Sequence, residues 1–180
     1  QELLSGAKEI GYPLAMKVIG PVHKSDVGGV ALNITDEETL LEKFHHMMNI
    51  PQTTAILMQP MLSGTQIFIG AKREGNFGHL ILCGLGGIFV ETLKDINYSL
   101  SPVSREEADE MIRTLRSYRI LEGTRGQEGV NIPMFSEAVR RVSALCQAAP
   151  EIFEMDINPL MAGTRQITAV DARIRIEKER

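Results

Sequence analysis

The sequence predicts an α+β fold that could form two lobes, on three observations. Apolar residues recur at the three-to-four spacing of amphipathic helices in separate stretches of the chain. Short aliphatic runs bounded by glycine or proline alternate with those stretches and are typical of strands. The chain has 180 residues, enough to bury a sizeable core as one domain or as two small lobes. We expect residues 1–58 to form the first lobe and residues 59–180 the second.

Composition narrows the classes of protein to which this chain could belong. A net charge of -4 disfavours a nucleic-acid binder, which needs a clustered positive surface. No apolar run is long enough to span a bilayer and no signal peptide opens the chain, so we expect a cytoplasmic protein without a membrane partner. Cys83 and Cys146 lie in apolar surroundings without metal-ligand spacing, which favours buried free thiols.

The first elements form a helix and a hairpin. Residues 2–10 are expected to be helical, because Gly11 and Pro13 follow them and stop a helix. Residues 13–19 and 30–34 read as two strands. The loop between them carries His23 and Lys24 and ends in Gly28 and Gly29.

This loop has the residue types of a phosphate cradle. Paired glycines let backbone N–H groups converge on an anion, and Lys17 and Lys24 add positive charge. The stretch is not a P-loop, which needs a lysine directly after the second glycine and a helix behind it. An ordinary glycine-rich hairpin with surface lysines explains the spacing equally well.

A second helix and three strands follow. Thr35 and Glu38 form a capping-box pattern, and Leu40, Leu41, Phe44, Met47 and Met48 give the helix behind them one apolar stripe. The adjacent His45 and His46 point to different sides and are expected to be solvated. Residues 53–60, 66–73 and 79–83 read as strands, and we expect them to form a three-stranded meander.

Two further loops contain candidate ligand contacts. Gly84, Gly86 and Gly87 lead to Glu91, then to Lys94-Asp95, and residues 97–100 resume an extended pattern. Such glycines serve either a ligand or a tight bend in a sheet. A capping box at Ser104 and Glu107 starts a helix with Met111, Ile112 and Leu115 inward. Beyond it Arg125 stands between glycines, where it could approach an anion or simply be solvated.

The last helix and the last two strands complete the chain. Residues 135–148 are expected to be helical, with an apolar stripe of Ala138, Val139, Val142, Leu145 and Cys146. Residues 152–160 and 166–174 read as a hairpin centred near Gly163 or Thr164, which places Asp171 opposite Asp156 or Asn158. Such hard oxygen donors suit Mg²⁺, which usually takes one or two protein oxygens and substrate phosphates. A register shift of one residue would break this site.

The motifs taken together resemble one family along nearly the whole chain. These motifs are Lys17-Val-Ile, His23-Lys-Ser-Asp-Val-Gly-Gly29, Gln59-Pro-Met61, Gly84 to Glu91 with Lys94-Asp95, Leu121 to Gly126, Asp156 to Leu160, and Val170 to Arg173. They are similar to motifs of the ATP-grasp domain of the ADP-forming acyl-CoA synthetases, acetyl-CoA synthetase among them. The resemblance covers about residues 11–174, and the motifs occur in the family's order.

The resemblance implies a fold, a reaction and partners. Two α+β lobes would clasp ATP or ADP with Mg²⁺, and the chain would lack the first elements of its N-terminal lobe. Acyl-CoA, ADP and phosphate would be interconverted with the acid, CoA and ATP through phosphohistidine. The partners would be the CoA-binding and CoA-ligase domains or subunit of the same enzyme, and the chain alone would be inactive. The acyl group, the choice of ADP or GDP and the oligomeric state stay open.

The resemblance also implies roles for individual residues. His23 would receive the phosphoryl group, and an imidazole nitrogen is a competent nucleophile near neutral pH. The segment from Gln59 through Pro60 to Met61 would lie against adenine. The remaining implied contacts are phosphate binding by Lys17, Lys24, Gly28, Gly29 and Arg125, orientation of the histidine by Glu91, and Mg²⁺ binding by Asn158 and Asp171. Gln66 stands where the family commonly has glutamate, which leaves any contact there open.

Two other functions compete with this one. A non-catalytic ATP-grasp-like module, of the kind fused to protein acetyltransferases, need not keep His23, Asn158 and Asp171 together, and this chain has all three. An unrelated α+β binding module would bind no Mg-nucleotide. The sequence therefore favours the enzyme domain.

Overall fold

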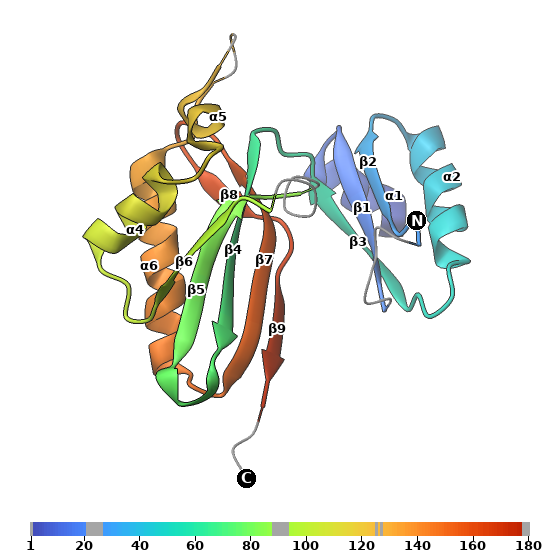
Figure 1. Ribbon diagram of the computed structural model, residues 1–180. Coiled ribbons are helices and arrows are strands. Elements are labelled where there is room, and N and C mark those ends of the chain that lie inside the picture. Colours follow the sequence, from blue (N-terminus) through green and yellow to red (C-terminus); the bar gives the residue numbers. More distant parts are fainter. Residues whose placement is uncertain (1, 21–26, 88–93, 125, 127, 178–180) are drawn as a thin grey trace. The chain divides into compact units, whose positions relative to one another are not determined.

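The computed structural model describes residues 2–20, 27–87, 94–124, 126 and 128–177. The chain divides into two compact units, Gln1–Leu62 and Ser63–Arg180, shown in Figure 1. Each unit has its own sheet and its own hydrophobic core. Among the described residues, no helix is long and apolar enough to cross a membrane.

The first unit is a three-stranded antiparallel sheet with two helices. Its strands are β1 (Leu14–Ile19), β2 (Val30–Ile34) and β3 (Ala55–Pro60), in the order β2-β1-β3. The helices α1 (Glu2–Ile10) and α2 (Glu37–Met48) cover one face, because their buried residues share a core with alternate residues of β1. This core consists of Ala7, Leu14, Met16, Val18, Ile34, Leu40 and Met47.

The expected hairpin of the first unit is confirmed, whereas the expected meander is wrong. β1 and β2 pair antiparallel, with Lys17 across from Val30. The strand over residues 53–60 does not join the two strands that follow it, since β3 pairs with β1 from Leu14↔Pro60 to Ile19↔Ala55. The meander in the structure begins one strand later. Alternation and turn residues identify a strand, but they do not say whether a strand that ends in a proline pairs with the strand after it or with an earlier one.

The cap of α2 also differs from the sequence prediction. Asp36, not Thr35, is the N-cap, and its carboxylate accepts the amide of Thr39 at 2.8 Å. Thr35 donates its hydroxyl to that carboxylate instead, at 2.9 Å. A charged acceptor next to the hydroxyl therefore takes the capping position. Of the predicted apolar stripe, Leu41 and Met48 are exposed; His45 and His46 are exposed as expected.

The second unit is built on a larger antiparallel sheet. The main strand order is β6-β5-β4-β7-β8, and β9 also pairs with β7. The strands are β4 (Thr65–Arg73), β5 (His79–Leu85), β6 (Ile96–Leu100), β7 (Ile152–Ala162), β8 (Ile167–Ala169) and β9 (Arg173–Ile176). The short 3-10 helix η1 (Gly75–Phe77) connects β4 to β5. This β4-β5-β6 run is the meander of the fold.

Two helices cover one face of this sheet. The helices α4 (Arg105–Arg113) and α6 (Ile132–Ala148) lie on the same side in Figure 1. Their buried residues share a core with Ile67, Ile69 and Ala71 of β4 and with Ile81, Cys83 and Leu85 of β5. The two cysteines are free and buried, as expected. The other face of the sheet is not part of this core.

The helices of the second unit confirm some expectations and correct others. Ser104 and Glu107 form the expected capping box, with bonds of 3.1 and 2.8 Å. α6 begins three residues before the predicted residue 135, because Asn131 caps it and a proline occupies its first turn. Leu145 of the predicted stripe is 45% exposed. The short helix α5 (Tyr118–Glu122) was not predicted from the sequence.

Candidate functional site

The expected oxygen donors, Asn158 and Asp171, lie where β7 pairs with β8 and β9, the strands that follow it in the chain. Leu160 pairs with Ala169 on one side and Asp156 with Arg173 on the other, in the same register. Between these pairs, the amide of Val170 donates to the carbonyl of Pro159 at 3.1 Å. This register places Asp171 across from Asn158, one of the two positions that the sequence allowed.

Charges of both signs gather around Asp156. Loss of hydration is the main cause that raises the pKa of Asp156 above its ordinary value, and the carboxylates of Asp171 and Glu154 raise it further. The guanidinium of Arg173 acts in the opposite direction. Neighbouring carboxylates that repel each other are stabilised by a bound cation, so this edge of the sheet is electrostatically suited to one.

The described part of the second glycine-rich stretch is attached to this edge. The amide of Gly87 donates to the Asn158 side-chain oxygen at 2.9 Å, and the amide of Gly86 donates to the Gln66 carbonyl at 2.8 Å. A Cβ on Gly86 would lie 2.6 Å from the carbonyl oxygen of Ile67. Gly87 has a positive φ of 61°, and a Cβ on it would meet the side-chain oxygen of Gln66. Close packing against the backbone therefore requires a glycine at position 86, and the positive φ favours a glycine at position 87, whatever ligand the loop also serves.

The donor set fits a hard divalent cation that is bound together with a ligand. The side chains of Asn158, Asp171 and Asp156 offer amide and carboxylate oxygens, the type that Mg²⁺ prefers. Among the described residues, no three His, Cys, Asp or Glu side chains enclose a metal position by themselves. Mg²⁺ usually takes one or two protein oxygens and completes its shell with oxygens of phosphate or water.

The candidate residues of the first unit lie on β1, β3 and the end of the hairpin loop. Lys17 is in the middle of β1 and is only 8% exposed. The carbonyl of Gly29 accepts the amide of Val18 at 2.9 Å, so the glycine pair lies beside the strand that carries Lys17. Gly28 has a φ of 71°, and a Cβ at this position would have no atom within 4 Å, so its requirement is conformational.

The predicted adenine segment is adjacent to the same strand. Gln59 pairs with Ala15, and Lys17 pairs with Leu57, so Gln59 and Lys17 project from the same face of the first sheet. Pro60 ends β3, and the amide of Met61 donates to the Pro13 carbonyl at 3.1 Å. Lys17, Gly29 and Gln59 thus come together within one unit, while Asn158 and Asp171 come together in the other.

Four predicted site residues lie outside the described residues. They are the predicted phosphoryl acceptor His23, its neighbour Lys24, and Glu91 and Arg125 of the two later loops. Their roles stay predictions.

Asp95, which belongs to the motif Lys94-Asp95, holds two distant parts of the second unit together. Its two carboxylate oxygens accept the amides of Arg116 at 3.0 Å and Ser117 at 2.7 Å. Burial acts to raise the pKa of Asp95, but the hydrogen bonds from Ser117 and Arg116 outweigh it and hold the pKa below its ordinary value. The carboxylate therefore joins the start of β6 to the turn before α5. An aspartate after a long loop is the only signal in the sequence.

These features, two α+β units with a glycine-rich stretch attached to an oxygen-rich sheet edge, define an ATP-grasp domain. The chain matches the family model described as "ATP-grasp domain" over residues 1–176, and it belongs to that family. The expected fold class is thereby confirmed.

Two similar proteins are named as ADP-forming ligases. The chain is 39% identical over 184 residues to "Acetate--CoA ligase [ADP-forming] I subunit beta" of Pyrococcus furiosus, covering 97% of this chain and 79% of that subunit. It is 38% identical to "Acetate--CoA ligase [ADP-forming] I" of Archaeoglobus fulgidus, covering 96% of this chain but only 27% of that relative. The resemblance found in the motifs is confirmed by these relatives.

Solved structures agree with the sequence relatives. A dinucleotide-forming acetyl-coenzyme A synthetase of Ca. Korarchaeum cryptofilum, in complex with coenzyme A and Ca-AMPCP, has a TM-score of 0.91 and 36% identity. The match covers 98% of this chain and 81% of that one. Another structure of that protein, with Mg-AMPPCP, has a TM-score of 0.84, and its phosphohistidine segment points towards the nucleotide-binding site.

Proposed function

We propose that this chain is the nucleotide-binding domain of an ADP-forming acyl-CoA synthetase. The complete enzyme interconverts acyl-CoA, ADP and phosphate with the free acid, CoA and ATP. Its other parts, in the same chain or in a second subunit, bind CoA and carry out the acyl transfer. The observation that carries the proposal is the sheet edge where Asn158 and Asp171 face each other, in a member of the ATP-grasp family.

The residues of the second unit have separate tasks in this proposal. Asn158 and Asp171 hold Mg²⁺, which neutralises phosphate charge when it is bound. Asn158 also accepts the amide of Gly87, so the same side chain positions the start of the glycine-rich stretch. Gln66 and Asp95 keep the two ends of that stretch in place, through the bonds to Gly86 and to the turn before α5.

The residues of the first unit bind the nucleotide. Lys17 and Lys24 contact its phosphates with the amides of Gly28 and Gly29, and the segment from Gln59 to Met61 lies against adenine. Arg125 of the second unit adds a phosphate contact, and Glu91 orients the histidine. These assignments rest on the family motifs and on the shared face of Lys17 and Gln59.

The chemical step takes place at His23. An imidazole nitrogen attacks the terminal phosphorus of ATP, the bond from that phosphorus to the ADP oxygen breaks, and a phosphohistidine and ADP result. The reverse step makes ATP. An acyl-CoA ligase can use such a carrier because the phosphoramidate retains the group-transfer potential of the phosphoryl group.

Phosphate labelling tests the proposal. The full-length protein is incubated with Mg²⁺ and ATP labelled with ³²P at the terminal phosphate, and the labelled residue is identified by mass spectrometry and acid lability. We expect the label on histidine, and we expect His23→Ala to remove it from this domain while His46→Ala leaves it unchanged. Label on a serine, or label that survives His23→Ala in this domain, would overturn the relay.

The alternative is a non-catalytic module fused to a protein acetyltransferase. Such a module would bind nucleotide without becoming phosphorylated. The presence of His23, Asn158 and Asp171 together favours the enzyme domain.

A further inference from the structure

The face of the second sheet that the helices leave open has an apolar half. Register places Leu80 between Lys72 and Leu100, and Leu82 between Gly70 and Tyr98, in rows across three strands. These residues alternate with Ile81 and Cys83, which belong to the helix-covered core. Leu80, Tyr98 and Leu100 therefore project from the opposite face.

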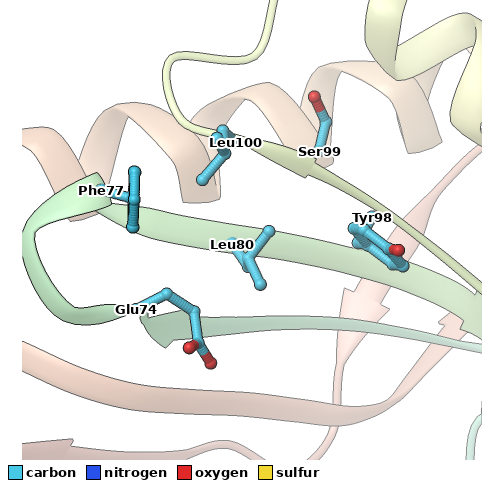
Figure 2. Close-up of a pocket in the computed structure, with 6 residues that line it drawn as sticks. All are labelled: Glu74, Phe77, Leu80, Tyr98, Ser99 and Leu100. Atoms are coloured by element: carbon cyan, nitrogen blue, oxygen red, sulfur yellow. The ribbon is translucent and has the colours of Figure 1, made fainter.

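Side chains of this half are exposed to an unusual degree. Phe77 is 80% exposed, Tyr98 68% and Leu100 46%. With Leu80 they border a hollow of about 400 Å³, which Glu74 and Ser99 complete. Figure 2 shows the six lining residues. We call Phe77, Leu80, Tyr98 and Leu100 the β5–β6 patch. Grouped exposed apolar side chains with a polar rim are typical of a protein–protein contact surface.

The patch shares its face with the candidate cation site. The row through Leu82 and Gly70 continues to Asp156 on β7 and then to Arg173 on β9. The apolar half over β5 and β6 is thus continuous with the charged half over β7 and β9. A partner seated on the patch would lie beside the part of the sheet where we propose phosphoryl chemistry.

The relatives indicate what the partner is. The domain forms most of a separate beta subunit in Pyrococcus furiosus, where 79% of that subunit matches, and about a quarter of a longer protein in Archaeoglobus fulgidus. A separate subunit is held by surface contacts rather than by a peptide link. In one structure of the Korarchaeum protein a phosphohistidine segment points towards the nucleotide-binding site.

We infer that the β5–β6 patch is the docking surface for the CoA-handling part of the same enzyme. The inference rests on the proposed function. The partner surface presents aliphatic or aromatic side chains to Leu80, Tyr98 and Leu100, and a hydrogen-bond donor to Glu74 at the rim. Docking there holds the two parts in the arrangement in which a phosphoryl group passes between them.

Cysteine footprinting on the full-length protein tests whether the patch is covered. Leu100 and Leu145 are a matched pair, because both are leucines of the second unit and they are 46% and 45% exposed. Leu100→Cys and Leu145→Cys are each treated with a maleimide, and the modified residue is followed by mass spectrometry. We expect the thiol at position 100 to react at least tenfold more slowly than the thiol at position 145. Equal rates would overturn the inference.

A second variant tests what the contact does. In Leu100→Lys, we expect ³²P to reach His23 from ATP at the wild-type rate, and transfer of the label to the rest of the enzyme to slow at least tenfold. Leu145→Lys should change neither rate. Unchanged transfer in Leu100→Lys contradicts the inference.

The remaining outcomes are also decisive. If sedimentation shows that Leu100→Lys breaks an assembly of identical copies while transfer within each copy is normal, the patch binds a second copy and the inference is wrong. If the wild-type protein takes no label at His23, the proposed function fails, while the footprinting result still reports whether the patch is covered.

Discussion

Replacing Asp95 by alanine removes the link between β6 and the turn that leads to α5. The carboxylate accepts two backbone amides, and Ser117 is only 7% exposed, so water replaces the lost partner poorly there. A hydrogen bond of this kind contributes about 1 kcal/mol, so we expect a loss of about 2 kcal/mol in the free energy of unfolding. For a chain of 180 residues this lowers Tm by about 4–8 °C.

The pH dependence separates this effect from a general loss of packing. The pKa of Asp95 lies below its ordinary value in the folded state, so its stabilisation is present above the ordinary pKa and is lost as the pH falls through the folded one. The gap between wild type and Asp95→Ala should be full at pH 7 and should narrow below about pH 4.

Thermal and urea unfolding at several pH values measure this gap. Glu110→Ala, at an exposed carboxylate on α4, serves as the control and should change the free energy by less than about 0.5 kcal/mol. A gap for Asp95→Ala that is absent at pH 7, or that stays constant down to pH 3, would refute the reasoning.

Three further changes have definite expected outcomes. Ser143→Ala should lower the free energy of unfolding by about 1–3 kcal/mol, because the buried Ser143 hydroxyl accepts the amide of Val103 at 2.9 Å. Ser136→Ala, on the same helix and similarly buried, is the control. It should cost less, since the Ser136 hydroxyl has no hydrogen-bond partner among the described residues. Gly87→Ala should destabilise by about 1 kcal/mol or more and weaken nucleotide binding in calorimetry, because of its positive φ and the contact with Gln66. Asp156→Asn should increase the metal-free free energy of unfolding at pH 7 by about 0.5 kcal/mol and so raise Tm slightly. The pKa of Asp156 is raised in the folded state, so this group favours folding only at low pH, and its ionisation at neutral pH opposes folding. A lower metal-free Tm in Asp156→Asn would contradict that sign.

Local patterns predicted the elements of this fold better than their partners. The capping box at Ser104, the β1–β2 hairpin and the two buried cysteines follow from short-range rules and are present. The partner of β3 depends on where the chain leaves the first unit, which no local rule states. Asp36 displaced Thr35 as the cap because two side chains competed for one amide.

The candidate site shows the same division. The two possible turn centres of the hairpin placed Asp171 across from Asp156 or Asn158, and the register in the structure places it across from Asn158. The bond from Gly87 to Asn158 joins positions 71 residues apart, and no periodicity in the sequence predicts it. Asp95 was missed for the same reason, since its partners are the amides of Arg116 and Ser117, which any residue type would supply.

The most direct test of the central claim is calorimetry of Mg-ATP binding to the full-length protein and its Asp171→Asn variant. Asp109→Asn on α4 is the matched control, with folding of all three proteins checked by thermal unfolding. We expect Asp171→Asn to weaken binding at least tenfold in the presence of Mg²⁺ and to make it insensitive to Mg²⁺ concentration, while Asp109→Asn binds like wild type. Wild-type affinity and Mg²⁺ dependence in a folded Asp171→Asn protein would contradict the assignment of the β7 edge as the cation site.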